Sequence, residues 1–280
     1  MSYRVPRSEA ALRELAACAW ELYRRAERDA SPHLVRPSMP ILFFGDSWAY
    51  ARSPVKVVTV GLNPSREEFS RASPFLRFPA AQHLARTPDP DLGAYLASLD
   101  SYFRTHPYRG WFDASYGPVL TGMGTSYYPG GAAVALHTDL CSPLATDPTW
   151  SRLGPQERRA LEEGGQRLWH DLMDVLQPDV VLLSVRRQYL TRIAFPATKG
   201  PWVLWTVEGP DRRRPYVVEG TRRRLSSGKE PLFVFGQAAQ TPFGTVSRAK
   251  KQGIGAAVRR EAHHEGAALP SPHASRSSGK

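Results

Sequence analysis

The chain has 280 residues, and its 37 Lys and Arg outnumber 26 Asp and Glu, so the net charge of +11 indicates a polyanionic partner or an unrelated basic surface. Cys18 and Cys141 are its only cysteines, which excludes a disulfide framework, a Cys-rich zinc site and an iron–sulfur cluster. The N-terminus lacks a signal-peptide core and no run approaches the roughly 18 apolar residues of a membrane span, so a cytoplasmic protein is expected.

The first predicted element is a helix over residues 8–30, whose apolar side chains share one face. That face carries Leu12, Leu15, Ala16, Trp20 and Tyr23. Four β-type runs follow at 56–60, 133–136, 180–185 and 232–235, and a helical segment at 155–176 separates the second run from the third. Strands separated by helices of this length predict right-handed crossovers and a parallel sheet.

We therefore predict an α/β fold with three layers, α/β/α, around a central, mostly parallel sheet of four strands. Two segments are long enough to be insertions: 80–131, expected to contain helix and to build a pocket wall, and 202–229, which reads as an inserted β-hairpin turning at 209–214. Residues 1–265 then form one domain, and residues 266–280 lack apolar periodicity and are expected to be a disordered basic tail.

The most informative stretch is VKVVTVGLNPS at 55–65, a buried-strand pattern that ends in a sharp turn. Gly61 and Pro64 restrict that turn and would hold Asn63 at the edge of the sheet, where open α/β sheets place their chemistry. An amide can orient a water but cannot remove its proton. Two other strands have polar exits, at 134–150 and 234–247, and three such exits from one parallel sheet should converge on a single crevice.

With these features the chain resembles the uracil-DNA glycosylase superfamily over residues 55–261. The family's Gly-x-Asp/Asn-Pro motif is similar to GLNPS at 61–65, its base-reading residue matches His137, and CSP at 141–143 followed by Pro155 and Glu157 resembles its second motif. AQTPFG at 239–244 lies where the family has a His-Pro-Ser-Pro-like loop. The resemblance implies that Asn63 positions the hydrolytic water and that Leu62 lines the base site.

Departures from the family pattern bear on the substrate. Gln240 stands where a histidine is usual and is our candidate for stabilising the leaving base, the alternative being a loop or helix cap. His137, a reader or a core histidine, replaces an asparagine, and Asp139 would read the base with it or hold its tautomer. Ser65 replaces a tyrosine that blocks the C5 side of the base, which leaves that side open.

Base flipping also needs stacking and DNA contacts. Phe75 and Phe78 fall where the superfamily places its stacking aromatic, although either fits a core position equally well. The segment 247–260 is predicted to be a basic helix whose start binds phosphate, and Phe243 is expected to act as the wedge that fills the vacated stack. The other predicted DNA contacts are Thr245, Ser247, Arg248, Lys250 and Lys251.

These features predict a monomeric, monofunctional DNA glycosylase with no cofactor and no metal, whose partner is DNA. The open C5 side favours a hydroxymethylated or glucosylated cytosine in phage DNA, and hence antiviral defence. Repair of uracil or mismatched thymine is the alternative within this class. A catalytically silent nucleic-acid-binding protein is the alternative outside it.

Overall fold

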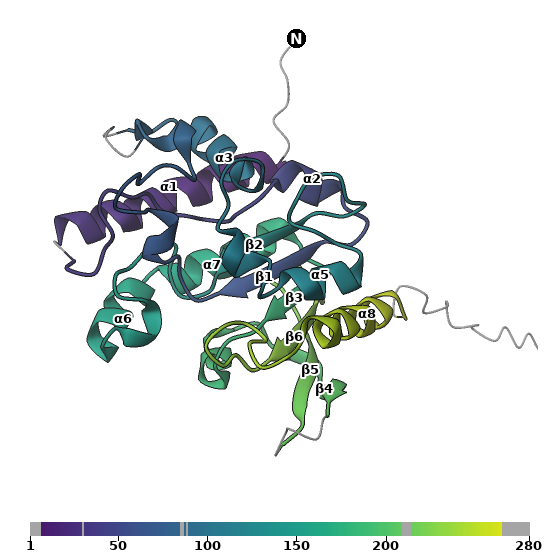
Figure 1. The fold of residues 1–280 in the computed structure, drawn as a ribbon. Coiled ribbons are helices and arrows are strands. Elements are labelled where there is room, and N and C mark those ends of the chain that lie inside the picture. Colours follow the sequence, from purple (N-terminus) through teal and green to yellow (C-terminus); the bar gives the residue numbers. More distant parts are fainter. Residues whose placement is uncertain (1–6, 30, 85–86, 88, 209–213, 265–280) are drawn as a thin grey trace, which may run out of the picture.

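The computed structural model describes residues 7–29, 31–84, 87, 89–208 and 214–264, and its centre is one six-stranded sheet (Figure 1). The strand order is β2-β1-β3-β6-β5-β4. The four parallel strands are β1 (Val57–Gly61), β2 (Ala135–Asp139), β3 (Val180–Leu183) and β6 (Leu232–Gly236). All four coincide with the predicted β-type runs to within a few residues. These strands are buried on both faces, which explains why they read as continuous apolar runs.

The predicted count of four strands is wrong, because the hairpin joins the sheet. β4 (Ala197–Val207) and β5 (Tyr216–Arg223) pair with each other in antiparallel fashion, and β5 also pairs antiparallel with β6 along Val218–Arg222. The hairpin therefore begins before residue 202 and extends the sheet to six strands. Most of its predicted turn, 209–213, lies outside the described residues.

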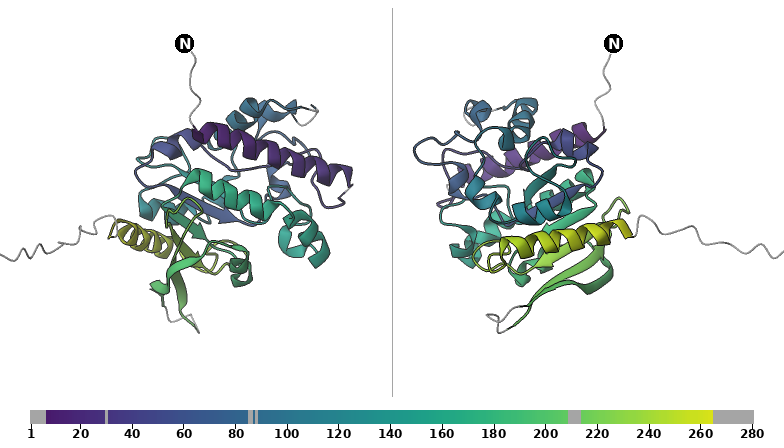
Figure 2. Two further views of the ribbon diagram at one scale, coloured as in Figure 1. Left: turned by 180° about the vertical axis from the view of Figure 1, so that it is seen from behind. Right: turned by 45° about the vertical axis from the view of Figure 1, so that its right-hand side comes forward.

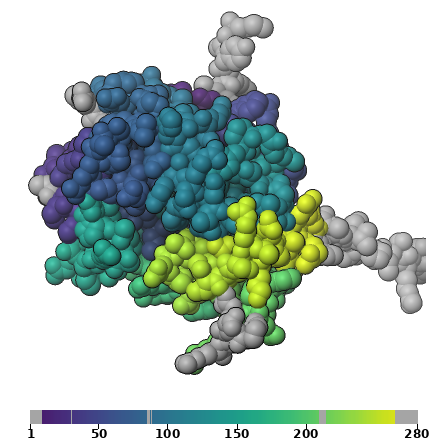
Figure 3. All heavy atoms as spheres, in the orientation of Figure 1, coloured from purple at the N-terminus to yellow at the C-terminus, as the bar shows by residue number. Residues whose placement is uncertain are grey.

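Helices cover both faces of the sheet. α1 (Arg7–Arg28) and α7 (Gly165–Leu176) pack against each other on one face, and α5 (Gly117–Met123) and α8 (Arg248–His264) lie together on the other (Figure 2). Figure 3 shows α8 as a ridge across the lower part of the second face. The α/β class and its layering are thus as predicted.

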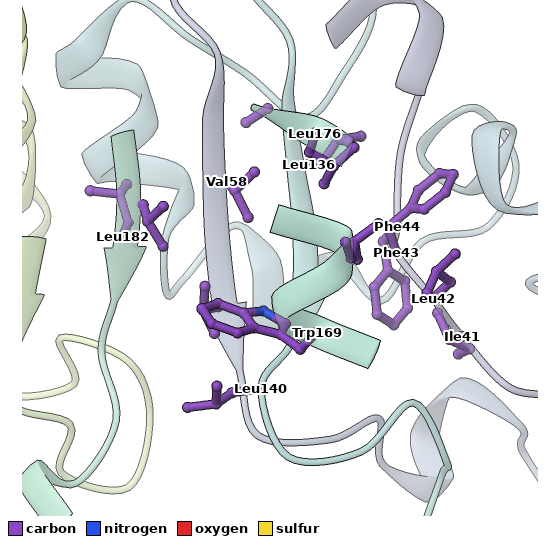
Figure 4. Packing of buried hydrophobic residues seen from close by; sticks show 14 of the residues in the cluster. Ile41, Leu42, Phe43, Phe44, Val58, Leu136, Leu140, Trp169, Leu176 and Leu182 are labelled. Atoms are coloured by element: carbon purple, nitrogen blue, oxygen red, sulfur yellow. The ribbon is translucent and has the colours of Figure 1, made fainter. Parts of the chain in front are cut away.

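The predicted first helix and its apolar face are confirmed, since the five residues assigned to that face are at most 9 % exposed. Beneath α7, Trp169 packs over the sheet among apolar side chains (Figure 4), and its indole N–H donates to Thr138 Oγ1 at 3.0 Å. A buried indole needs such an acceptor. α5 and α8 approach closely through glycines, because a Cβ on Gly122 would lie 2.0 Å from the Gln252 carbonyl oxygen.

The remaining helices correct one detail of the prediction and confirm another. The segment 155–176 is two helices, α6 (Pro155–Glu162) and α7, because Gly164 adopts φ +81° between them. The insertion at 80–131 does contain helices, namely α3 (Leu92–Asp100), α4 (Arg109–Phe112) and α5, while α2 (Ser47–Arg52) precedes β1.

Two further predictions concern the C-terminal tail and membrane-spanning segments. The predicted tail at 266–280 lies outside the described residues. In the described part of the chain, none of the helices combines the length and apolar character needed to cross a membrane.

Candidate active site

The loop after β1 is held rigidly by the loop after β2. Backbone N–H groups of Leu140 and Cys141 donate to the carbonyl oxygens of Gly61 and Leu62, at 3.0 and 2.9 Å. Farther along, the Thr146 N–H donates to the Pro64 carbonyl at 3.3 Å. The pairing of β1 with β2 therefore continues beyond the strands, which fixes the GLNPS turn.

The amide of Asn63 has one fixed orientation in this loop. Its Nδ2 donates to the carbonyl oxygens of Pro64 and Leu144 at 2.8 and 3.1 Å, and to Thr146 Oγ1 at 2.9 Å. Carbonyl oxygens only accept, so the nitrogen must be on this side. Oδ1 is left as the free acceptor, with no hydrogen bond among the described residues. It can accept a hydrogen bond from a water and so orient that water's lone pair.

A small cavity of about 110 Å³ lies beside this amide. Its aromatic lining consists of Phe44, Tyr108, Trp111 and Phe112, and its polar lining of Asn63, Ser65, Glu68, His137 and Asp139. An engineered apolar cavity of about 150 Å³ binds benzene. We call this cavity the base-sized pocket, because its volume suits one six-membered ring. Its aromatic wall comes from 108–112, inside the segment predicted to build one.

His137 is held in the pocket by a buried hydrogen-bond chain. Its Nδ1 lies 2.7 Å from Thr59 Oγ1, which lies 2.6 Å from the Tyr127 hydroxyl. Thr59 Oγ1 also donates to the Leu136 carbonyl oxygen, 3.4 Å away. Nδ1 is therefore engaged from within the core, and Nε2 is the ring nitrogen left toward the pocket. Burial lowers the pKa of His137 to about 3, so the imidazole is neutral.

Asp139 does not hold the imidazole in one tautomer, contrary to one of the roles predicted for it. Its Oδ1 is 3.9 Å from His137 Nε2, which is too long for a hydrogen bond. Burial, and secondarily the charge of Glu68, raise the pKa of Asp139 well above its usual range. Its Oδ2 is buried and has no partner among the described residues.

Glu68 is a second buried carboxyl in the pocket, and sequence analysis missed it. It ends the short 3₁₀ turn η1 (Arg66–Glu68), accepts a hydrogen bond from the Tyr102 hydroxyl at 2.7 Å, and lies 3.7 Å from Arg77. Burial raises its pKa to about 7 despite these two partners. The pocket thus contains two buried carboxyls whose pKa values are raised above their usual range.

A wider crevice of about 610 Å³ adjoins the base-sized pocket. The two share Gly61, Leu62, Asn63, Ser65 and Trp111. The opposite side of the crevice is formed by residues after β3 and β6, including Arg186 and Gln240, and Arg152 also lines it. The predicted convergence of the three strand exits is confirmed, with the β2 exit facing the pocket and the β6 exit facing the crevice.

Gln240 is therefore apart from the residues predicted to read the base. It is exposed and lines the crevice, whereas His137 and Asp139 line the pocket. The structure brings Leu62, Asn63 and Ser65 together with His137 and Asp139 in the pocket. Gln240 shares the crevice with Leu62, Asn63 and Ser65 but does not line the pocket.

The predicted stacking residues are wrong. Phe78 is fully buried and stacks on Phe69, with ring centroids 5.6 Å apart, and Phe75 packs edge-on to the same ring. Neither lines the pocket or the crevice. The aromatic lining instead includes Phe44, whose backbone pairs with His137 in an isolated antiparallel bridge, and Trp111. Nothing in the local pattern around Phe44 signals that long-range pairing.

Two of the predicted DNA contacts are also wrong. Phe243 is fully buried, and its N–H donates to Ser184 Oγ at 2.8 Å, so it cannot act as a wedge. Lys251 is buried and donates to the Ala114 carbonyl. Thr245, Ser247, Arg248 and Lys250 are exposed at the start of α8, where Ser247 Oγ accepts the Lys250 N–H and caps the helix.

No protein-family model matches the chain, and no curated protein matches its sequence. Among the described residues, no three His, Cys, Asp or Glu side chains are grouped as metal ligands. The site offers an amide of fixed orientation, a neutral imidazole and two buried carboxyls of raised pKa beside a ring-sized pocket.

Proposed function

We propose that this protein is a DNA glycosylase, which flips a non-canonical pyrimidine out of DNA and hydrolyses its N-glycosidic bond. The observation that carries the proposal is the oriented amide of Asn63, placed where a ring-sized aromatic pocket meets a wider crevice. Of the segments that resemble the uracil-DNA glycosylase superfamily, the turn after β1, His137 of β2 and the loop after β6 line these cavities.

The chemistry suits an amide. Cleavage of the bond gives the sugar oxocarbenium character, so a water that is oriented by Asn63 Oδ1 needs no strong base. His137 has Nε2 toward the pocket, and we assign it, with its ring proton on Nε2, the donor role toward an oxygen of the departing base, in place of Gln240. None of the described lysines lines either cavity, so the product is an abasic site without strand cleavage.

The favoured substrate is a cytosine with a C5 substituent, as in hydroxymethylated or glucosylated phage DNA. A base in the small pocket would have Ser65 and Leu62 beside the opening to the crevice, and both residues line both cavities. A substituent can therefore extend into the crevice. Such a substrate makes antiviral defence the proposed biological role, and uracil or mismatched thymine the competing substrates.

DNA binding is supported by the charges along the crevice. Arg152 and Arg186 are exposed there, and neither forms an ion pair with a described residue. Exposed arginines of this kind can contact phosphates without reading sequence. The start of α8 follows the β6 exit loop and adds Arg248 and Lys250.

The test is base release from a panel of DNAs: unmodified, uracil-containing, hydroxymethylcytosine-containing and glucosylated. Abasic sites are scored after heating in base. Release confined to the modified phage-type DNAs supports both the activity and the defensive role, whereas release from uracil DNA alone supports repair. Binding of all the DNAs without any abasic site would replace the proposal with a silent nucleic-acid-binding protein.

A further inference from the structure

Asp139 is a polar group of the base-sized pocket whose role the proposed hydrolysis leaves open. It is the last residue of β2, and its register partner across the sheet is Gly61 of β1. Its side chain is 3 % exposed, and Oδ2 has no hydrogen-bond partner among the described residues. A buried, unpartnered carboxyl oxygen is costly, which indicates that a ligand completes it.

Resting on the proposed base excision, we infer that Asp139 is a catalytic general acid that protonates N3 of a bound cytosine-type base. The proton leaves Oδ2, and the new N3–H bond forms as the C1′–N1 bond breaks. The electron pair of the broken bond enters the ring. The base departs as neutral cytosine, the sugar as an oxocarbenium ion, and Asp139 remains as a carboxylate.

The hydrolysis is then completed without another reactant. The water that Asn63 orients adds to C1′, and its proton passes to solvent. Asp139 recovers a proton from solvent once the base has left. Each atom and electron pair is thus accounted for by the DNA, water and this one carboxyl.

The surroundings of Asp139 keep it protonated before the reaction. The titratable groups near it are His137 and Cys141 on its own segment, Glu68 from η1, Tyr108 across the pocket and Tyr116 before α5. None of these is a cation: the imidazole is neutral, and burial raises the pKa of the Cys141 thiol. The Tyr116 hydroxyl donates to the Val60 carbonyl instead of to Asp139. Arg77, the nearest basic partner of Glu68, forms no ion pair with Asp139.

The absence of a side chain on Gly61 leaves space for the Asp139 carboxyl at the pocket. A Cβ at position 61 would lie 2.4 Å from Asp139 Oδ1 and 3.1 Å from His137 Nε2, so only glycine permits both groups to occupy this side of the pocket. Asp139 and the Nε2–H donor then face the same small volume. A base there would meet both groups along one edge.

Cytosine, more than uracil, needs such an acid. Uracil carries hydrogen on N3 and leaves as an anion whose charge its two carbonyl oxygens share. Cytosine has an amino group in place of one carbonyl, so its anion is a poorer leaving group, but its N3 has a free lone pair that accepts a proton. An acid on N3 thus accelerates loss of cytosine and has no site on N3 of uracil.

The experiment compares wild type with Asp139→Asn on two DNAs that differ only at the base edge, hydroxymethylcytosine and hydroxymethyluracil at the same position. Where the wild type requires glucose, the glucosylated pair is used. Single-turnover base release is followed from about pH 5 to about pH 9. Taking the variant-to-wild-type ratio for each DNA cancels differences in base pairing.

We expect Asp139→Asn to lose about 10²- to 10⁴-fold on hydroxymethylcytosine and only a few-fold on hydroxymethyluracil. The wild-type rate on hydroxymethylcytosine should fall about tenfold per pH unit above the pKa of Asp139, and the rate on hydroxymethyluracil should not. That pH comparison needs no variant, so it tests the inference even if Asp139→Asn fails to fold.

Two kinds of failure are separable. Equal losses on both DNAs, an unaffected variant, or the same pH profile on both bases would overturn the role of Asp139 while base excision stands. If the wild type released neither base from any DNA of the panel, the proposed function itself would be wrong, and this inference with it.

Discussion

The two walls of the site differ in how firmly they hold their polar groups. The β1–β2 wall consists of residues 61–65 and 137–146, which backbone hydrogen bonds and the Asn63 amide hold together. The imidazole of His137 in this wall is held through Thr59 and Tyr127. The β3–β6 wall, residues 184–189 with 238–242, presents exposed side chains such as Arg186 and Gln240.

This contrast suggests different roles for the two walls, catalysis for one and DNA contact for the other. The orientation of a catalytic side chain accelerates a reaction only if that orientation exists before the substrate binds. The side chains of the β1–β2 wall meet that condition. Exposed side chains on long stems can follow a phosphate backbone but cannot hold a water within the tolerance that catalysis requires. We therefore place the reaction on the first wall and DNA contact on the second.

The sharpest way to break the comparison is Asn63→Ala. This change removes Oδ1, so base release should fall about 10²- to 10³-fold while DNA affinity stays nearly intact. Gln240→Ala, on the other wall, should reduce release only a few-fold. Single-turnover rates and a binding titration measure both effects. Equal losses in the two variants would remove the distinction between the walls.

Asn63→Ala also frees the Leu144 carbonyl, so a structural effect needs its own control. Thr146→Val removes one acceptor of the same amide but leaves Oδ1 in place. It should lower the free energy of unfolding by about 1–3 kcal/mol and leave base release within a few-fold. A loss of release in Thr146→Val as large as in Asn63→Ala would make Asn63 a structural residue.

Gly61→Ala tests how tightly the first wall is packed. The added Cβ meets Asp139 Oδ1 at 2.4 Å, so the carboxyl must move, and we expect base release to fall about 10²-fold. Gly110→Ala is the matched control, because its Cβ would meet only Tyr108 Cε2 at 3.8 Å, an ordinary contact. Similar rates for both variants would show that the pocket tolerates the displacement.

Stability should depend on pH through the carboxyls of the same wall. The pKa of Glu68 is about 7 in the folded protein against 4.5 normally, so between these values the native state binds more protons than the unfolded state. The free energy of unfolding therefore decreases as pH rises through that window, by roughly 3 kcal/mol in total. The raised pKa of Asp139 extends the decrease to higher pH.

Glu68→Gln isolates that contribution, since an amide oxygen can still accept from Tyr102 but cannot ionise. Urea unfolding at about pH 5 and about pH 8 should show a smaller loss in Glu68→Gln than in the wild type. Its exposed neighbour provides the control, Glu67→Gln, which should behave as the wild type does. A wild type equally stable at both pH values would contradict the burial of a neutral Glu68.

The sequence predicts the position of Asn63 better than the positions of the aromatic side chains, for a physical reason. Asn63 is placed by its own neighbours, Gly61 and Pro64, and the strand that positions it has a continuous apolar pattern. Phe243 and Phe78 depend on distant partners: Phe243 turns inward at φ 52° because its N–H reaches Ser184, and Phe78 packs on Phe69. Aromatic residues in loops carry no period that indicates depth.

Dependence on distant partners also explains why the predicted number of strands is wrong. The residues of β5 show that they form a strand, but pairing with β6 depends on where the hairpin returns, which local pattern does not encode. His137 was predicted as a reader or a core residue, and its burial fits both, since it lines the pocket while its Nδ1 is held from within the core.

The smallest effects are expected for substitutions on the second wall, and they test how that wall binds DNA. Arg186 is exposed in the crevice without an ion pair to a described residue, whereas its neighbour Arg187 forms two hydrogen bonds with Glu219, at 3.0 and 2.8 Å. Arg186→Ala should therefore weaken DNA binding modestly and reduce the salt slope of the binding constant by about 1. Arg187→Ala should leave that slope unchanged, because its guanidinium is already occupied. If both variants changed the slope equally, the wall would bind DNA through its overall charge, and the crevice would have no defined path for the phosphates.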